Sequence, residues 1–174
     1  MSKLISKPNQ SGFTLIEMLI YIGIAGIILA TISALLAASF TTRVKNTVIQ
    51  EVELQGAQVT LQITQAIRRS EAVTSPTPGN QLTALTLDVG SDPEIYSDFG
   101  SVVHRTSGNP ASALPVHSSS ITVSGLNFRN VSRPDTPDSI EFEFTLTYVN
   151  TTGKNEYDYS KTFYGSASIY ELGV

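Results

Sequence analysis

One carboxylate lies inside an otherwise uncharged hydrophobic stretch near the start of the chain. From Phe13 to Phe40 the sequence runs for 28 residues with Glu17 as its only charge. A carboxylate within a membrane helix is costly, and such residues are usually paired or functional. In the simpler interpretation, Glu17 stays hydrated at the level of the lipid headgroups. The residues around Glu17 decide between these two interpretations.

The segment from Gly12 to Leu19 reads GFTLIEML and follows a short leader with two lysines and no acid. It resembles the processing motif of prepilins, the precursors of type IV pilins and type II secretion pseudopilins. The resemblance implies that a membrane-bound prepilin peptidase cuts after Gly12 and methylates the new N-terminal residue, Phe13. It also implies that Glu17 pairs with the Phe13 amine of a neighbouring subunit. Opposite charges attract strongly in a low-dielectric helix bundle, so this pair would set the register of assembly.

The uncharged stretch is long enough to cross a membrane. Residues 18–42 contain no charge over 25 positions, whereas about 20 apolar residues span a bilayer and a signal peptide core has about 7–15. The rest of the chain is too small to cover this stretch as the core of a soluble protein. We expect a single pass through the cytoplasmic (inner) membrane, with an extracytoplasmic head. The resemblance implies later incorporation into a surface or periplasmic filament.

Small residues recur at helical spacing within the apolar stretch. Gly23, Gly26 and Ala30 lie three and four residues apart, which places them on one stripe of a helix. Such stripes let membrane helices approach closely. Small residues are also common in membrane spans without any such role. We therefore predict helix packing at this stripe, with that alternative left open.

A missing proline bears on the type of subunit. Many major pilins carry a proline where this chain has Ala34, and no proline occurs from Phe13 to Ala72. This favours a minor pilin or pseudopilin, which initiates, caps or functionalises a filament. A major pilin and an uncleaved membrane-anchored binding protein are the alternatives. The implied partners are prepilin peptidase, other pilin or pseudopilin subunits, the inner-membrane assembly machinery and, before assembly, membrane lipid.

The helical pattern continues beyond the apolar stretch. Aliphatic residues at four- and seven-residue spacings form a stripe of Val44, Val48, Val52, Val59, Ile63 and Ile67. We predict one helix over residues 13–72, with 13–40 in the membrane or filament core and 41–72 amphipathic. The period does not sustain the strict heptad of a coiled coil. Gly56 is a weak point, costing about 1 kcal/mol relative to alanine.

The remaining residues, 73–174, predict a β-rich head. Ile140–Tyr148 alternates apolar and polar residues, as a strand with one dry face does. We expect one antiparallel sheet of about four to six strands packed on the amphipathic half of the helix, with a bulge at Ser124-Gly125. Loops are expected at 73–80, 91–100, 107–120 and 132–138, and a strand is expected to include Tyr157, Tyr159 and Phe163. The fold class is α+β, and it resembles the pilin fold.

Composition excludes several activities. The chain has no cysteine, and its sequence lacks the phosphate-loop, zinc-protease and serine-hydrolase motifs. Residues 1–42 carry a net charge of +1 and residues 43–174 a net charge of −5, so no basic face for nucleic acid is expected. We predict no enzyme, no cofactor and no metal site. His104 and His117 are expected at the surface, and the acids of residues 91–100 and 132–138 as solvated turns rather than calcium ligands.

Overall fold

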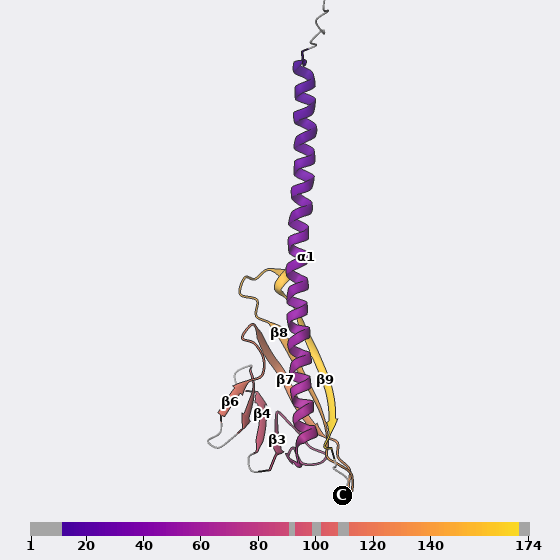
Figure 1. Ribbon diagram of the computed structural model, residues 1–174, viewed down its shortest axis with the longest axis vertical. Helices are drawn as coiled ribbons and strands as arrows, with labels where there is room; N and C mark the ends of the chain where they lie inside the picture. Colours follow the sequence, from indigo (N-terminus) through magenta and orange to yellow (C-terminus); the bar gives the residue numbers. More distant parts are fainter. Residues whose placement is uncertain (1–11, 91–92, 99–101, 108–111, 171–174) are drawn as a thin grey trace, which may run out of the picture. The chain divides into compact units, whose positions relative to one another are not determined.

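A computed structural model describes residues 12–90, 93–98, 102–107 and 112–170. Within these residues one helix, α1 (Leu15–Arg69), is followed by nine strands, and a short 3-10 helix, η1 (Asn155–Tyr157), precedes the last strand (Figure 1). The chain forms two compact units, residues 1–42 and residues 43–174, so the change in composition after Thr42 is also a boundary in packing. The hydrogen-bonded helix nevertheless runs through that boundary. It begins two residues later and ends three residues earlier than the predicted helix.

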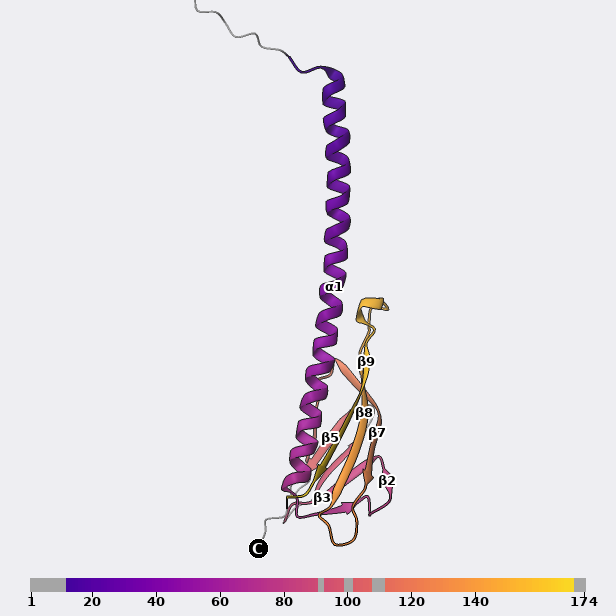
Figure 2. The same ribbon diagram turned by 90° about the vertical axis from the view of Figure 1, so that its right-hand side faces the viewer.

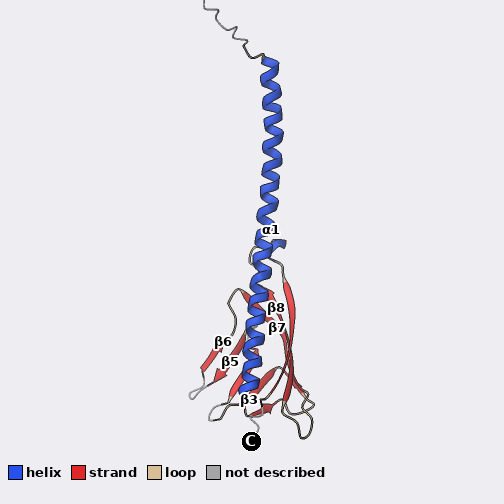
Figure 3. Ribbon diagram, turned by 45° about the vertical axis from the view of Figure 1, so that its right-hand side comes forward, coloured by secondary structure: helices blue, strands red, loops and turns tan. Residues whose placement is uncertain are grey.

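The strands of the described residues, drawn red in Figure 3, form two antiparallel sheets. The first sheet has the strand order β1 (Ala72–Ser75), β3 (Ala84–Asp88), β4 (Glu94–Asp98), β5 (Val103–Ser107) and β6 (Ser112–Pro115). The second sheet has the order β2 (Gln81–Leu82), β7 (Ile121–Asn130), β8 (Ser139–Tyr148) and β9 (Ser160–Ser168). An α+β fold with a long helix and antiparallel sheets is confirmed, but the prediction of a single sheet is wrong.

Several predicted loops contain short strands. β1 lies in the expected loop 73–80, β4 in 91–100 and β6 in 107–120. These strands have four or five residues, and the prolines, serines and acids in and around them hide the two-residue alternation on which strand prediction depends. The expected strand over 157–163 is also corrected, because Tyr157 belongs to η1 and β9 begins at Ser160.

The predicted stripe of α1 supplies one side of the core. Val48, Val52, Val59, Ile63 and Ile67 are all buried. From Val52 onward they pack in one cluster with aliphatic side chains of the first sheet and aromatic side chains of the second. The second half of α1 lies alongside both sheets in two perpendicular views (Figures 1 and 2). The predicted stripe is therefore buried from Val48 to Ile67, whereas Val44, its first predicted member, is only half-buried.

Two glycines make room for aromatic rings in this core. A Cβ atom at Gly56 would lie 2.1 Å from Cζ of Phe163, and one at Gly165 would lie 2.2 Å from Cζ of Phe142. The ring of Phe163 stacks on Phe144, with the ring centroids 5.5 Å apart. Gly56 therefore serves a packing function that outweighs its poor helix propensity.

The second sheet follows the sequence pattern closely. Every second residue of β8 from Ile140 to Leu146 is buried, as predicted. The register of β7 against β8 shifts between Ser124 and Asn127, and Gly125 has a φ of 64°. The predicted bulge at Ser124-Gly125 is thus confirmed, and a glycine there accommodates the positive φ.

Candidate functional site

The predicted cleavage site lies directly before α1. Gly12, Phe13 and Thr14 precede the first helical residue, Leu15, and all three are exposed. The side chain of Phe13 is 71% exposed, and its ring meets that of Tyr21 edge-on at 6.1 Å. The peptide bond after Gly12 therefore lies in exposed, non-helical backbone next to the helix start.

Glu17 forms a capping box with Thr14. The backbone N–H of Glu17 donates to Oγ1 of Thr14, and the backbone N–H of Thr14 donates to Oε2 of Glu17, both at 3.4 Å. The Thr14 hydroxyl also donates to Oε2 at 3.4 Å. This reciprocal pattern satisfies two amides that a helix N-terminus leaves unpaired. The spacing Thr-x-x-Glu is a sufficient signal for this capping box, which was not among the predicted features.

The capping contacts leave Glu17 available to a second partner. A carboxylate has about four acceptor positions, and the contacts with Thr14 are all long and exposed. The geometry therefore allows Glu17 to cap its own helix and to accept a cation from another chain. The second role is a prediction, since it needs a neighbouring subunit.

The first half of α1 presents apolar side chains all round. The helix is long and apolar enough to cross a membrane, with none of its most apolar window buried. Gly23, Gly26 and Ala30 are exposed, and nothing lies within 4 Å of where a Cβ would stand at either glycine. The predicted packing stripe is thus open to a partner helix, and its use stays a prediction.

The comparisons with known proteins agree with this geometry. Residues 7–33 match the family model described as the prokaryotic N-terminal methylation motif. The motif and the apolar helix support a pilin-type protein. The match supports the family of type IV prepilins and type II secretion pseudopilins. Searches of curated proteins and of solved structures found no significant match.

The two histidines differ in burial. His117 is buried, contrary to its predicted surface position: its Nε2 accepts a hydrogen bond from the Val103 N–H at 3.1 Å, and its Nδ1 lies 2.9 Å from the Ser118 carbonyl oxygen. His104 is half-buried on β5. Among the described residues, no group of three or more acids or histidines could hold a metal ion.

The prediction for Glu94 is also wrong, because this acid is buried on β4 rather than solvated in a loop. It accepts a hydrogen bond from the Tyr96 hydroxyl at 2.8 Å, forms an ion pair with Arg69, and lies 3.8 Å from Nε of Arg105. Burial, together with the Glu94 acceptor, raises the pKa of Tyr96 well above its ordinary value. These contacts hold the end of α1 against the first sheet. Glu94 therefore has a structural role. Asp92 lies outside the described residues.

Tyr157 and Tyr159 of the head have structural partners. Tyr157 stacks on Tyr148 with ring centroids 6.3 Å apart. Tyr159 donates its hydroxyl proton to Glu53 of α1 at 3.2 Å, and Lys161 binds the same carboxylate at 2.6 and 2.7 Å. These contacts tie the start of β9 to the helix.

Proposed function

We propose that this protein is a minor pilin or pseudopilin subunit of a type IV pilus or a type II secretion pseudopilus. The observation that carries the proposal is the match of residues 7–33 to the methylation motif, at the start of a helix whose exposed first half has Glu17 as its only charge up to Thr42. The role is structural rather than catalytic. The absence of a proline at Ala34 supports a minor subunit over a major one.

In this proposal, prepilin peptidase cuts after Gly12 and methylates the amine of Phe13. The exposed backbone of Gly12 and Phe13 supports access by the enzyme. Assembly then proceeds through the first half of α1, with Gly23, Gly26 and Ala30 at the helix contacts. Glu17 binds the Phe13 amine of a neighbouring subunit, since a charge buried without a partner in the filament core would be strongly unfavourable.

Before assembly, the precursor crosses the cytoplasmic membrane once, with its head outside the cytoplasm. Its partners are then lipid and the inner-membrane assembly machinery. After assembly it belongs to a surface or periplasmic filament. The apolar side chains exposed along the first half of α1 support both states, because lipid and neighbouring helices each remove them from water.

The mature N-terminus tests this function. Mass spectrometry of the protein from cells with active prepilin peptidase should find an N-terminal peptide that begins with N-methylated Phe13. The same protein from cells without the peptidase is the control and should retain Met1 or Ser2. An unprocessed N-terminus in both strains would contradict the proposal and favour an uncleaved membrane-anchored binding protein. Copy number in purified filaments then separates a minor from a major subunit.

A further inference from the structure

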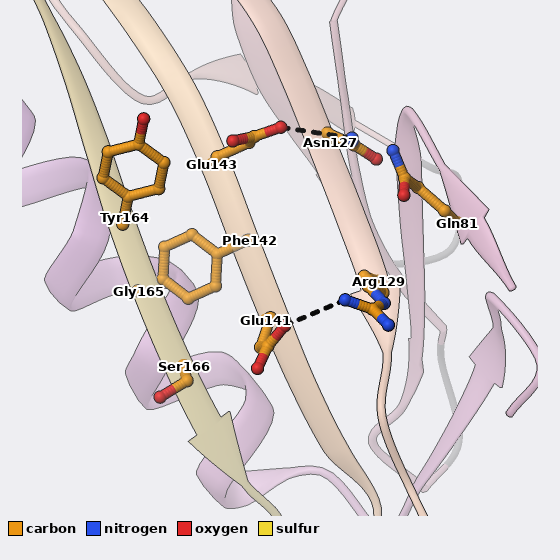
Figure 4. Close-up of a pocket in the computed structure, with 9 residues that line it drawn as sticks. All are labelled: Gln81, Asn127, Arg129, Glu141, Phe142, Glu143, Tyr164, Gly165 and Ser166. Atoms are coloured by element: carbon orange, nitrogen blue, oxygen red, sulfur yellow. Dashed lines mark hydrogen bonds and ion pairs between the residues drawn. The ribbon is translucent and has the colours of Figure 1, made fainter. Parts of the chain in front are cut away.

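The outer face of the second sheet carries a groove of about 630 Å³. Figure 4 shows that its polar side chains come from neighbouring strands of this sheet, with Glu141 and Glu143 on β8 at the centre. This face is the wet side of β8, since the intervening Ile140 and Phe142 are buried. The groove lies in the head and shares no residue with the N-terminal processing site.

Strand register arranges the groove in two rows. One row runs from Asn127 through Glu143 to Tyr164, because these residues are paired across β7, β8 and β9. The next row runs from Arg129 through Glu141 to Ser166. Residues two apart in a strand are separated by about 7 Å, so the two carboxylates face the same space without touching.

Hydrogen bonding in these two rows differs from that in the rows on either side. The flanking rows are closed by short hydroxyl pairs, Ser139 with Ser168 at 2.7 Å and Thr145 with Thr162 at 2.8 Å. Within the groove the contacts are long: Asn127 donates to Glu143 at 3.4 Å, and Arg129 lies 3.8 Å from Glu141. Both carboxylates therefore keep free positions for accepting hydrogen bonds, whereas the hydroxyl groups of the flanking rows are bound to each other.

The aromatic ring of Tyr164 completes the groove. Its side chain is 72% exposed, on a strand whose other outward residues are serine and threonine. It lies across from Glu143, and Figure 4 shows the two side chains next to each other at one end of the groove. An exposed tyrosine beside a carboxylate offers a cation both a ring face and an anion.

We propose that this groove binds an arginine- or lysine-bearing segment of a partner protein. The cation lies against Tyr164 and between the two carboxylates, closer to Glu143, because Arg129 already neutralises part of the Glu141 charge. The two carboxylates outnumber the single guanidinium of the groove, so charge complementarity favours a basic partner. This inference goes beyond the proposed assembly function and does not depend on cleavage after Gly12.

The test measures peptide binding to the full-length protein in detergent micelles. The probe is a fluorescently labelled glycine-serine peptide with two arginines, followed by fluorescence anisotropy at low salt. We expect binding that weakens with added salt. Glu143→Gln and Tyr164→Ala should each lower the affinity by about fivefold, and Glu141→Gln should lower it less. These side chains are on the surface, so each variant should keep the circular dichroism spectrum of the parent.

Two controls make the result decisive. Asp98→Asn removes one exposed acid from the first sheet and should leave the affinity unchanged. The same peptide with glutamines in place of the arginines should not bind. The proposal is overturned if Asp98→Asn weakens binding as much as Glu143→Gln, or if the glutamine peptide binds equally well. Binding of neutral oligosaccharides but not the arginine peptide would also overturn it.

Discussion

Glu17 has two properties, a helix-capping side chain and a negative charge, and substitutions of Glu17 and Thr14 can remove one without the other. Its side chain caps the helix through hydrogen bonds, and its charge is available to a neighbouring chain. Glutamine serves in a capping box as well as glutamate does, so Glu17→Gln removes the charge and keeps the cap. Thr14→Ala does the reverse, at a cost of about 0.5–2 kcal/mol in helix stability.

We predict that Glu17→Ala and Glu17→Gln are cleaved normally but enter filaments poorly. Cleavage acts on the backbone between Gly12 and Phe13, whereas incorporation needs the carboxylate in the proposed pair. Thr14→Ala should enter filaments at near-normal levels, since it keeps the charge. The measurement is the ratio of filament-bound to membrane-bound protein for each variant. Normal incorporation of Glu17→Gln would reject the charge pair.

Gly56 is important for core packing, because its missing side chain leaves room for the ring of Phe163. We predict that Gly56→Ala lowers the free energy of unfolding of the head by about 1–3 kcal/mol, because the new methyl group would overlap the ring of Phe163. This range is the net change, after a gain of about 1 kcal/mol from better helix propensity. Denaturant unfolding measures the change, with the exposed Gln58→Ala as the control. A stabilised Gly56→Ala protein would show that the ring moves aside freely.

At the scale of elements, α1 is fastened to the strands by polar contacts as well as by its apolar stripe. Lys161 of β9 binds Glu53, and Glu94 of β4 binds Arg69 at the end of the helix. Ser118 contacts Gln55 and Glu51 from the chain before β7. These contacts join segments far apart in the sequence, so they fix where along the helix each strand packs.

The contact between Glu53 and Lys161 should make stability depend on pH. A hydrogen bond and the charge of Lys161 hold the pKa of Glu53 below its ordinary value of 4.5. The contact therefore stabilises the fold fully above pH 4.5 and less as the pH falls through the lowered pKa. Because both side chains are about 40% exposed, the effect should be small.

We therefore predict that Glu53→Gln has a slightly lower Tm than the parent at pH 7, and that this difference shrinks as the pH falls below 4.5. Thermal unfolding followed by circular dichroism at a series of pH values measures it. Glu156→Gln, an acid of η1 without a lysine partner in the described structure, should show no such trend. A difference that grows as the pH falls would contradict the assigned direction.

The whole molecule consists of two units with different solvent requirements. Every buried hydrophobic residue of the described core lies at or after Val48, in the unit of residues 43–174. The helix before that point exposes large apolar side chains throughout. Stability of the head and solubility of the chain therefore depend on different segments.

We predict that a fragment of residues 43–174 is soluble without detergent and unfolds cooperatively, because it retains the complete core. The full chain should need detergent or lipid, since its first unit carries 25 consecutive uncharged residues, long and apolar enough to cross a membrane. Sedimentation and thermal unfolding of the two proteins in the same buffer provide the comparison. An aggregated or unfolded fragment would show that the head depends on the first unit.

Sequence alone determined the features that local periodicity and short motifs encode. The apolar stretch, the stripe from Val48 to Ile67, the alternation in β8 and the methylation motif each occupy contiguous residues, so their spacing reveals them directly. The Thr14–Glu17 capping box belongs to the same class. It could have been predicted from its spacing, although it was not.

Only the tertiary structure decided which distant residues meet. It placed the neighbouring strands β2 and β3 in different sheets and buried Glu94 and His117. It also placed Phe163 against Gly56, and it built the groove from three long strands. None of these contacts has a local signal, because each depends on strand pairing and helix docking across large sequence separations. A short polar strand looks like a loop until its neighbours supply the other half of its hydrogen bonds and the core that its alternate side chains face.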